Sequence, residues 1–359
     1  MYYSGIDLHK RTCCISTIDN EGTLVDQVEL PNDELLILNY FHSKGGEHRA
    51  VVECTANWYW LSDLFLLHGI DLTLAHAKYL KAICYAKVKT DKVDSLTLAQ
   101  LLRMGLVPAA HQIDPQKRWI RDVMRSRLKL MSKKISSVNS IHRILEKFNI
   151  TLPEGKGLSY PAHLDYLEQV DLDRGYRLQV NNLCAQIRLL DRQIKGIERW
   201  LKPILIPNED VRRLLTLPGV GEISGYTMYL EVDGIGRFES AKRFLSYCRL
   251  VPGADNSSSR RRHKSGNKDG NRYLKVAFMD AAIKAVQYYP EICQFYQRKL
   301  RKKIKPIART IVAQELATIA YHVLKYQTVF ETFKGMKLSK EKKYRWPRPT
   351  SPGFLTGSE

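Results

Sequence analysis

The sequence predicts an α/β N-terminal domain, a helical coiled-coil middle and a mainly helical C-terminal domain. Strand-like and helix-like runs alternate through the first part, a heptad pattern follows, and the last third is basic with Gly-rich turns. The chain has 359 residues and 44% hydrophobic content, which is enough for two or three domains with separate cores. The predicted parts are 1–110, 111–205 and 206–334, followed by a basic tail over 335–359.

The first 110 residues predict a mixed sheet with interspersed helices. The expected strands are Tyr2–Asp7, Thr12–Ile18, Thr23–Leu30, Arg49–Glu53 and Asp71–Ala75, with a turn at Asn20-Glu21-Gly22. The expected helices are Glu34–His42, Trp58–His68, Tyr79–Tyr85 and Asp91–Arg103. Three antiparallel strands followed by βαβ units are an α/β order, and it is also the order of RNase H and RuvC-like nucleases.

Four carboxylates lie where a metal-dependent nuclease would need them. Asp7 and Glu53 end two expected strands, and Asp91 and Asp94 begin an expected helix. Asp91 and Asp94 are three residues apart, so they share one helix face. Oxygen ligands that converge from different elements suit Mg²⁺, and the implied chemistry is phosphodiester cleavage or transfer. A lone carboxylate is more often a surface charge, so the interpretation depends on all four together.

The charge of the chain is concentrated at its C-terminal end. Residues 1–100 carry 9 Lys and Arg against 13 Asp and Glu, residues 101–235 carry 21 against 15, and residues 236–349 carry 27 against 8. The net charge is +20, so almost all of it lies in the last third. Such a segregated field favours a polyanionic partner, most simply nucleic acid, over the alternative of a membrane surface.

The sequence predicts a cytoplasmic protein without a membrane span. It has no apolar run of about 18 residues and no signal peptide. Its seven cysteines are scattered and form no Cys-x-x-Cys pair or zinc-type cluster, which indicates reduced thiols.

A heptad pattern marks the middle of the chain. Apolar residues alternate at intervals of three and four through Val180, Leu183, Ile187, Leu190, Ile194, Ile197 and Leu201. An earlier helix repeats the pattern less regularly through Met124, Leu128, Met131, Ile135, Val138, Ile141, Leu145 and Phe148. The segment Thr151–Pro161 between them is an expected loop. The pattern fits an intramolecular helical hairpin and a seam for self-association equally well.

Two further motifs carry candidate nucleic-acid contacts. Leu217-Pro218-Gly219-Val220-Gly221 between two helical patterns is typical of a helix-hairpin-helix, in which Gly219 and Gly221 let backbone amides approach a phosphate. The same turn can be a plain connector. The second motif is a run of serines and basic residues whose candidate contacts are Arg260, Arg261, Arg262, Lys264, Lys268 and Arg272. It could be a solvated loop, yet a serine beside guanidinium groups also suits phosphoryl transfer.

Several motif blocks together resemble one known family. The blocks are Gly5-Ile6-Asp7-Leu8-His9-Lys10, Val52-Glu53-Cys54-Thr55, Lys89-Thr90-Asp91-Lys92-Val93-Asp94, Leu250-Val251-Pro252-Gly253 and Gly270-Asn271-Arg272-Tyr273-Leu274. In this order they resemble the DEDD transposases of the IS-one-ten insertion-sequence family, which include the Piv-type DNA invertases. The resemblance covers residues 1–330 and implies a RuvC-like catalytic domain, a coiled-coil segment and a C-terminal transposase domain.

The resemblance also implies an activity and partners. Members of this family are site-specific recombinases that excise and insert their own element, so double-stranded donor and target DNA are the expected substrates. Many members use an element-encoded bridge RNA to choose these DNAs, which implies RNA-guided action. Strand exchange implies a homo-oligomer, a dimer or tetramer, acting on the nucleoid in a bacterial or archaeal cytoplasm.

The family's catalytic serine lies five residues after the proline of a Leu-x-Pro motif and is usually followed by glycine. Counting from Pro252 places this serine at Ser257. Ser258 replaces the usual glycine, which makes Ser258 the second candidate. The implied mechanism has Mg²⁺ at Asp7, Glu53, Asp91 and Asp94 and a covalent attack by Ser257 on the phosphate.

Two rival functions explain less of the sequence. A Holliday-junction resolvase would use only the carboxylates and a metal-activated water, which leaves the serine block and the basic third without a purpose. A non-catalytic nucleic-acid-binding protein would make the four carboxylates a coincidence. A structured non-coding segment beside this reading frame would favour guidance by RNA.

Overall fold

The computed structural model describes residues 1–83, 90–152, 157–158, 161–252 and 269–336. It divides into two compact units, Met1–Pro115 and Gln116–Glu359. The helices of the predicted coiled-coil middle and the C-terminal helices belong to the same second unit. The finer divisions predicted at residues 110, 205 and 334 stay predictions.

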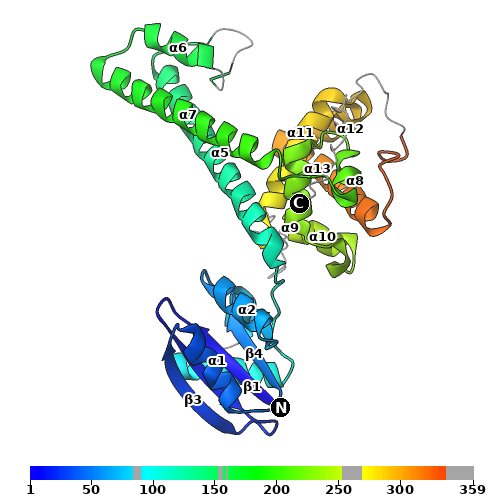
Figure 1. Cartoon of the computed structure of the whole chain (residues 1–359). Coiled ribbons are helices and arrows are strands. Elements are labelled where there is room, and N and C mark those ends of the chain that lie inside the picture. The colour runs from blue at the N-terminus through cyan, green and yellow to red at the C-terminus, as the bar shows by residue number, and fades with distance from the viewer. Residues whose placement is uncertain (84–89, 153–156, 159–160, 253–268, 337–359) are drawn as a thin grey trace, which may run out of the picture. The chain divides into compact units, whose positions relative to one another are not determined.

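The first unit is built on one mixed five-stranded sheet with the strand order β3-β2-β1-β4-β5 (Figure 1). The strands are β1 (Tyr2–Leu8), β2 (Thr12–Ile18), β3 (Leu24–Pro31), β4 (His48–Glu53) and β5 (Asp71–Ala75). β2 lies antiparallel to both β1 and β3, whereas β1, β4 and β5 are mutually parallel. The mixed sheet predicted from the sequence is confirmed, and each strand begins and ends within one residue of its expected bounds.

Helices cover both faces of this sheet. The helices described in the first unit are α1 (Glu34–Ser43), α2 (Trp58–Leu67), α3 (Ala77–Ile83) and α4 (Asp91–Arg103). Phe41 of α1 and Phe65 of α2 pack in one buried cluster with Ile6 of β1. On the other face, Leu98 of α4 packs with Val51 of β4. The predicted end of α3 at Tyr85 lies outside the described residues, and α4 has its predicted bounds.

A glycine in β1 determines how closely α4 approaches the sheet. A Cβ atom at Gly5 would lie 1.9 Å from the backbone oxygen of Ser95 and 2.5 Å from the backbone nitrogen of Ala99, both in α4. Real Cβ atoms do not come this close to backbone, so only glycine fits at this crossing. Because residues alternate along a strand, Asp7 leaves β1 on the same face as Gly5 and therefore on the side of α4.

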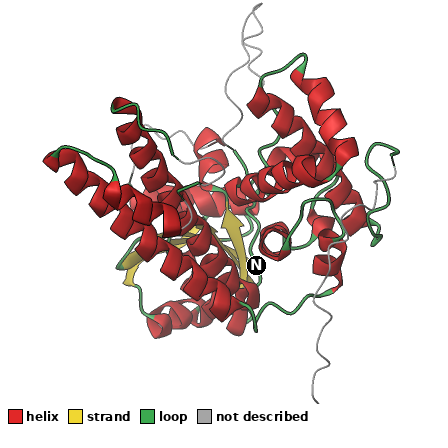
Figure 2. Ribbon diagram, turned by 90° about the horizontal axis from the view of Figure 1, so that it is seen from above, coloured by secondary structure: helices red, strands yellow, loops and turns green. Residues whose placement is uncertain are grey.

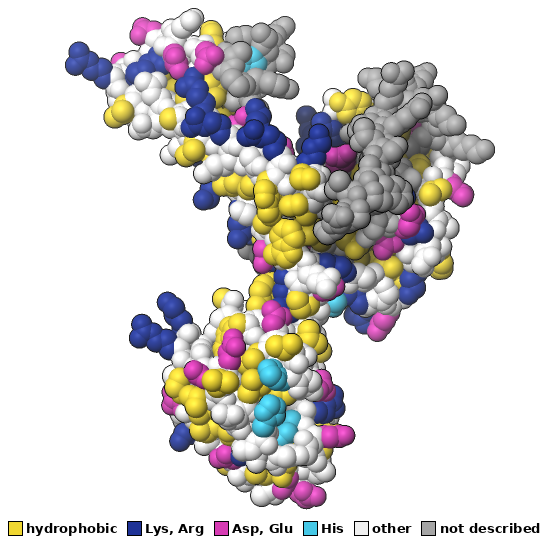
Figure 3. Space-filling view, in the orientation of Figure 1, with side chains coloured by type: hydrophobic (Ala, Val, Ile, Leu, Met, Phe, Trp, Pro, Cys, Tyr) yellow, Lys and Arg dark blue, Asp and Glu magenta, His cyan; other side chains and the backbone are white. Residues whose placement is uncertain are grey.

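The second unit contains a long helical hairpin, α5 (Pro115–Lys147) and α7 (Arg174–Leu201). Ile141 and Leu145 of α5 share a buried cluster with Val180 and Ile187 of α7, so the hairpin is intramolecular. Lys and Arg side chains gather along α7 (Figure 3). Self-association of the chain is not tested by this packing and stays a prediction.

One residue of the predicted seam points away from the hairpin interface. Ile135 of α5 is 53% exposed, whereas its neighbour Lys134 is buried. The Lys134 ammonium donates to Asp191 Oδ1 of α7 over 2.6 Å, so an ion pair takes the place that the apolar pattern assigned to isoleucine. The spacing of apolar residues cannot reveal a charged pair inside an interface. For this reason the prediction that Ile135 lies in the seam was wrong.

The rest of the second unit consists of shorter helices and loops (Figure 2). The helices are α6 (Pro161–Gln169), α8 (Glu209–Leu215), α9 (Glu222–Val232), α10 (Ala241–Tyr247), α11 (Arg272–Tyr288), α12 (Pro290–Leu300) and α13 (Lys305–Lys325), with a 3-10 turn η1 (Ile235–Arg237). Phe244, Phe278 and Leu316 are fully buried in a core that α10, α11 and α13 share. The mostly helical remainder predicted from the sequence is confirmed.

Within the described part of the chain, every helix is too short or too polar to cross a lipid bilayer.

Candidate metal centre

Two of the predicted carboxylates lie at the carboxyl ends of neighbouring parallel strands. β1 and β4 pair in parallel with Ile6 opposite Val52, so the next residues along each strand, Asp7 and Glu53, leave the sheet side by side. The side chain of Asp7 is 19% exposed. Asp7 and Glu53 are both partly buried at this edge of the sheet.

The other two predicted carboxylates lie in the first turn of α4, and this turn is held to the sheet by polar contacts. The Thr90 side chain caps the helix by accepting from the Val93 backbone N–H over 3.2 Å. Gln27 of β3 donates from Nε2 to the Lys92 backbone oxygen over 3.0 Å. These contacts fix the end of α4 at which Asp91 and Asp94 lie.

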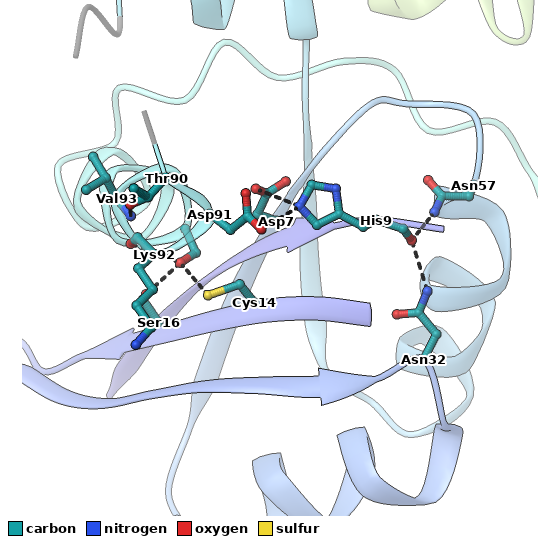
Figure 4. Close-up of polar contacts among 11 residues, drawn as sticks. Asp7, His9, Cys14, Ser16, Asn32, Asn57, Thr90, Asp91, Lys92 and Val93 are labelled. Atoms are coloured by element: carbon teal, nitrogen blue, oxygen red, sulfur yellow. Dashed lines mark hydrogen bonds and ion pairs between the residues drawn. The ribbon is translucent and has the colours of Figure 1, made fainter. Parts of the chain in front are cut away.

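A second set of contacts holds α4 to β2. The Ser95 and Ser16 hydroxyls hydrogen-bond to each other over 2.7 Å, and Cys14 Sγ lies 3.4 Å from the Ser95 hydroxyl. The Ser95 hydroxyl also donates to the Lys92 backbone oxygen over 3.2 Å. Figure 4 labels Cys14, Ser16 and Lys92, three partners of Ser95, near Asp7 and Asp91.

A histidine completes the cluster. His9 Nε2 lies 3.4 Å from Asp7 Oδ2 and 3.2 Å from Asp91 Oδ2, so the imidazole joins the two carboxylates (Figure 4). The backbone of His9 is held in place, because its carbonyl oxygen accepts from Asn32 Nδ2 over 2.9 Å and from Asn57 Nδ2 over 2.6 Å. No role of His9 was predicted from the sequence. Its spacing of two residues from Asp7 is the signal that could have found it, since both side chains lie on one face of the chain.

The charges of the other three predicted carboxylates all act on the pKa of Asp7. Burial raises the pKa of Asp7 above its usual value, the positive potential of His9 lowers it, and the charges of Asp91, Asp94 and Glu53 raise it further. The net direction is upward. Several acidic groups thus crowd Asp7 and oppose its ionisation, which is the situation that a bound cation would relieve.

The donor atoms of this cluster fit a divalent metal ion. Asp7, His9 and Asp91 can each offer one ligand atom, and these three atoms lie within 4.8 Å of one another. Glu53 and Asp94 add carboxylates whose charge reaches Asp7. Carboxylate oxygens are the ligands of Mg²⁺ and Mn²⁺, and imidazole suits the transition metals.

Most of the nucleic-acid contacts predicted in the second unit fall on residues outside the described part of the chain. Ser257, Ser258, Arg260, Arg261, Arg262, Lys264 and Lys268 lie outside the described residues. Arg272 is exposed at the start of α11, and its guanidinium lies 5.2 Å from the centre of the Tyr273 ring. The role of these residues in binding nucleic acid stays a prediction.

The turn between α8 and α9 packs tightly on α11. Gly219 has φ +77°, and a Cβ atom there would lie 2.2 Å from the Ala281 backbone oxygen of α11. The Gly221 N–H donates to the Ser224 hydroxyl over 3.0 Å. Gly219 therefore has a structural role in this fold, and the phosphate contact predicted for Gly219 and Gly221 stays a prediction.

A buried charged network ties the hairpin to the C-terminal helices. Glu231 of α9, whose side chain is 2% exposed, accepts from Arg125 Nε over 2.6 Å and from Arg125 Nη2 over 2.7 Å. Asn271 Nδ2 donates to the same carboxylate over 2.6 Å. Asn271 also caps α11 by accepting from the backbone N–H groups of Tyr273 and Leu274. No sequence motif predicts this network.

Comparison with known proteins identifies the family. Residues 4–150, which include all four predicted carboxylates, match a model of DEDD transposases of the IS110 type, and residues 211–297 match the model described as the transposase IS116/IS110/IS902 family. The chain belongs to this family. IS110 is the IS-one-ten family that the motif blocks resemble. Membership of the DEDD group implies dependence on a divalent metal ion.

Individual IS110-family relatives are distant in sequence. The chain is 24% identical over 215 residues to the transposase for insertion sequence element IS1111A of Coxiella burnetii, which is 59% of this chain and 56% of that protein. It is 24% identical over 251 residues to the IS1328 transposase of Yersinia enterocolitica, 68% of this chain and 75% of the relative. A pilin gene-inverting protein of Moraxella bovis is 29% identical over 127 residues, 34% of this chain and 39% of the relative. The match thus spans little more than half of the Coxiella protein.

Proposed function

We propose that this protein is a transposase that cuts and rejoins the DNA of its own insertion element at a metal-dependent carboxylate site. One observation carries the proposal. Asp7 and Asp91 face each other through His9, with Glu53 and Asp94 close enough for their charges to act on Asp7. This cluster lies inside the region that matches the DEDD transposases.

The fold of the first unit supports the same activity. Three antiparallel strands followed by two parallel ones, with α4 placed against β1, agree with a RuvC or RNase H-like nuclease domain. Asp7, Glu53, Asp91 and Asp94 would hold Mg²⁺. The ion would polarise the scissile phosphate and stabilise the leaving oxygen. His9 would keep Asp7 and Asp91 oriented toward that ion.

The nucleophile in this proposal is Ser257, with Ser258 as the alternative. The Ser257 hydroxyl loses its proton and its oxygen forms a bond to phosphorus, while the bond from phosphorus to the leaving sugar oxygen breaks and that oxygen takes up a proton. The strand stays covalently attached to the protein, so it can be rejoined without ATP. Arg260, Arg261, Arg262 and Lys264 would neutralise phosphate charge in this step.

The proposed partners follow from the family. Donor and target duplex DNA are the substrates, an element-encoded bridge RNA selects them, and the chain acts as a dimer or tetramer in the cytoplasm. The basic last third of the sequence supports a polyanionic partner. The pilin gene-inverting name of the Moraxella relative supports recombination of DNA.

Substitution of the carboxylates tests the proposal. Asp7→Ala and Asp94→Ala should each abolish Mg²⁺-dependent strand cleavage and leave DNA affinity largely unchanged, because the charge that binds DNA is concentrated in the basic last third. Asp71→Ala is the matched control, since Asp71 is an exposed carboxylate at the opposite end of the sheet, paired with Arg49 over 2.9 Å. Normal cleavage by Asp7→Ala, or equal loss in Asp71→Ala, would contradict the assignment.

A further inference from the structure

Four basic residues form a ridge along α7, which we call the basic ridge. Arg192, Lys195, Arg199 and Lys202 follow one another at intervals of three, four and three residues, so they lie on one face of the helix. All four are exposed, and together with Glu198 they border a shallow hollow of about 510 Å³. Figure 3 shows the Lys and Arg side chains along α7.

The acidic residues beside the ridge are already paired with cations of α5. Glu198 Oε1 accepts from Arg127 Nε over 2.8 Å. Asp191 Oδ1 accepts from Lys134 Nζ over 2.6 Å, and its other oxygen pairs with Lys195 over 2.8 Å. Both acidic side chains of α7 are therefore used in holding the hairpin together.

This pairing leaves the ridge with uncompensated positive charge. Among the described residues, no carboxylate pairs with Arg192, Arg199 or Lys202. The surrounding hairpin does not offset them either, because α5 holds 10 Lys and Arg against 2 Asp and Glu, and α7 holds 6 against 2. Exposed cations that no carboxylate neutralises repel one another, and together they attract a polyanion.

The length of the ridge fits the backbone of a nucleic-acid duplex. Ten residues separate Arg192 from Lys202, which at about 1.5 Å per residue spans about 15 Å along the helix axis. Phosphates of one DNA strand follow each other every 3.4 Å along the duplex axis, so about four phosphates face such a length. The three cations that no described carboxylate pairs with, Arg192, Arg199 and Lys202, thus lie along a length that about four phosphates face.

We propose that the basic ridge of α7 binds the phosphate backbone of duplex DNA, as a contact in addition to those predicted from the sequence for Arg260, Arg261 and Arg262. The proposal deepens the proposed function and rests on it for the choice of DNA as the polyanion. The ridge makes only phosphate contacts, so it positions the duplex and contributes no sequence preference. Its role is to hold DNA against the hairpin while cleavage takes place elsewhere.

The test uses the full-length triple variant Arg192→Gln/Arg199→Gln/Lys202→Gln and a labelled DNA duplex of arbitrary sequence. Fluorescence anisotropy over a series of salt concentrations gives the slope of log affinity against log salt. Three lost phosphate contacts should lower this slope by about 2.7, which corresponds to roughly 500-fold weaker binding at about 0.1 M salt. The melting temperature should change little, because the three side chains are exposed and form no ion pair with a described carboxylate, and the one bond lost, from Arg199 Nε to the Lys195 backbone oxygen, is long at 3.4 Å.

The control removes positive charges from two exposed ion pairs outside the basic last third. Arg49 and Arg212 are each paired with a carboxylate, and the variant Arg49→Gln/Arg212→Gln should keep the wild-type slope. An unchanged slope in the ridge variant, or an equal fall in the control, would overturn the proposal. A fall seen only with an RNA duplex would also overturn it and assign the ridge to RNA.

Separate measurements of DNA binding and DNA cleavage distinguish a failure of this inference from a failure of the proposed function. At limiting protein the ridge variant should cleave DNA more slowly than the wild type because it binds less DNA, and more protein should raise its rate, whereas Asp7→Ala should not cleave at any protein concentration. A wild-type protein that binds DNA through the ridge but never cleaves it would refute the proposed function and leave the ridge in place. A protein that cleaves DNA while the ridge variant binds normally would refute the ridge alone.

Discussion

Replacement of Glu231 should destabilise the second unit more than replacement of an exposed charged residue does. Glu231 accepts three hydrogen bonds, two from Arg125 and one from Asn271, at 2.6 to 2.7 Å, and its side chain is 2% exposed. In Glu231→Gln an amide NH₂ meets these donors, and the Arg125 guanidinium loses its counter-charge. Breaking a buried pair in this way costs about 3–5 kcal/mol. Arg125 is 26% exposed and can be partly hydrated, so we expect the lower end, about 3 kcal/mol.

Thermal denaturation measures this cost. For a unit of this size each kcal/mol lowers the melting temperature by about 2–4 °C, so Glu231→Gln should melt about 6–12 °C below the wild type. Replacing both partners, in Arg125→Met/Glu231→Leu, should recover part of the loss, because no unpaired charge is then buried. The exposed pair Arg212–Glu209 is the control, and Glu209→Gln should cost less than about 0.5 kcal/mol. A cost below about 1 kcal/mol for Glu231→Gln would refute the view that this network is buried and structural.

Three further predictions concern the hairpin, the α8–α9 turn and the metal centre. Hydrogen bonds, first from Lys134 and then from Lys195, hold the pKa of Asp191 below its usual 3.8, so ionised Asp191 stabilises the folded state fully above pH 3.8 and this stabilisation is lost as the pH falls through the folded pKa. Melting curves from about pH 3 to pH 7 should show that Asp191→Asn is less stable than the wild type at neutral pH and less sensitive to acid. Parallel curves for the two proteins would contradict this. Gly219→Ala should lower the free energy of unfolding, measured in urea, by more than about 1 kcal/mol, because Gly219 has a positive φ and a Cβ there would lie 2.2 Å from the Ala281 backbone oxygen. Gly236 has open space around it, so Gly236→Ala should change the free energy of unfolding by less than about 0.5 kcal/mol. Because the pKa of Asp7 is raised in the folded protein, ionised Asp7 destabilises the metal-free fold above that pKa. In EDTA, Asp7→Asn should therefore melt at a higher temperature than the wild type, and it should lose the stabilisation that Mg²⁺ gives the wild type. A lower melting temperature of Asp7→Asn in EDTA would show that Asp7 supports the metal-free fold.

The sheet and the carboxylates could be predicted because their signals are local. Each strand is a short run of alternating or apolar residues between turn residues, and Asp7 and Glu53 stand at the ends of such runs. Parallel strands present their carboxyl ends at one edge, so two strand ends already predict a site. The contact of Asp91 with this edge depends on Gly5, whose close packing under α4 the alternation of residues does not reveal.

The features that were missed depend on contacts between distant segments. His9 belongs to the cluster because Asn32 and Asn57, which precede two different helices, hold its carbonyl. Lys134 and Glu231 are buried because a partner of opposite charge comes from another helix, Asp191 and Arg125 respectively. A charged residue within a helix predicts a solvated face, so neither position could be recognised without the tertiary structure.

Detection of a covalent protein–DNA adduct tests the central claim most directly. Wild-type protein with Mg²⁺ and end-labelled element DNA should give a band on a denaturing gel that migrates slowly and disappears on protease treatment. Asp7→Ala and Ser257→Ala should each lose this band while remaining folded, and loss in Ser258→Ala instead would move the nucleophile by one residue. If the wild type cleaves DNA without any adduct, and both serine variants still cleave, then a metal-activated water is the nucleophile and the serine mechanism is contradicted.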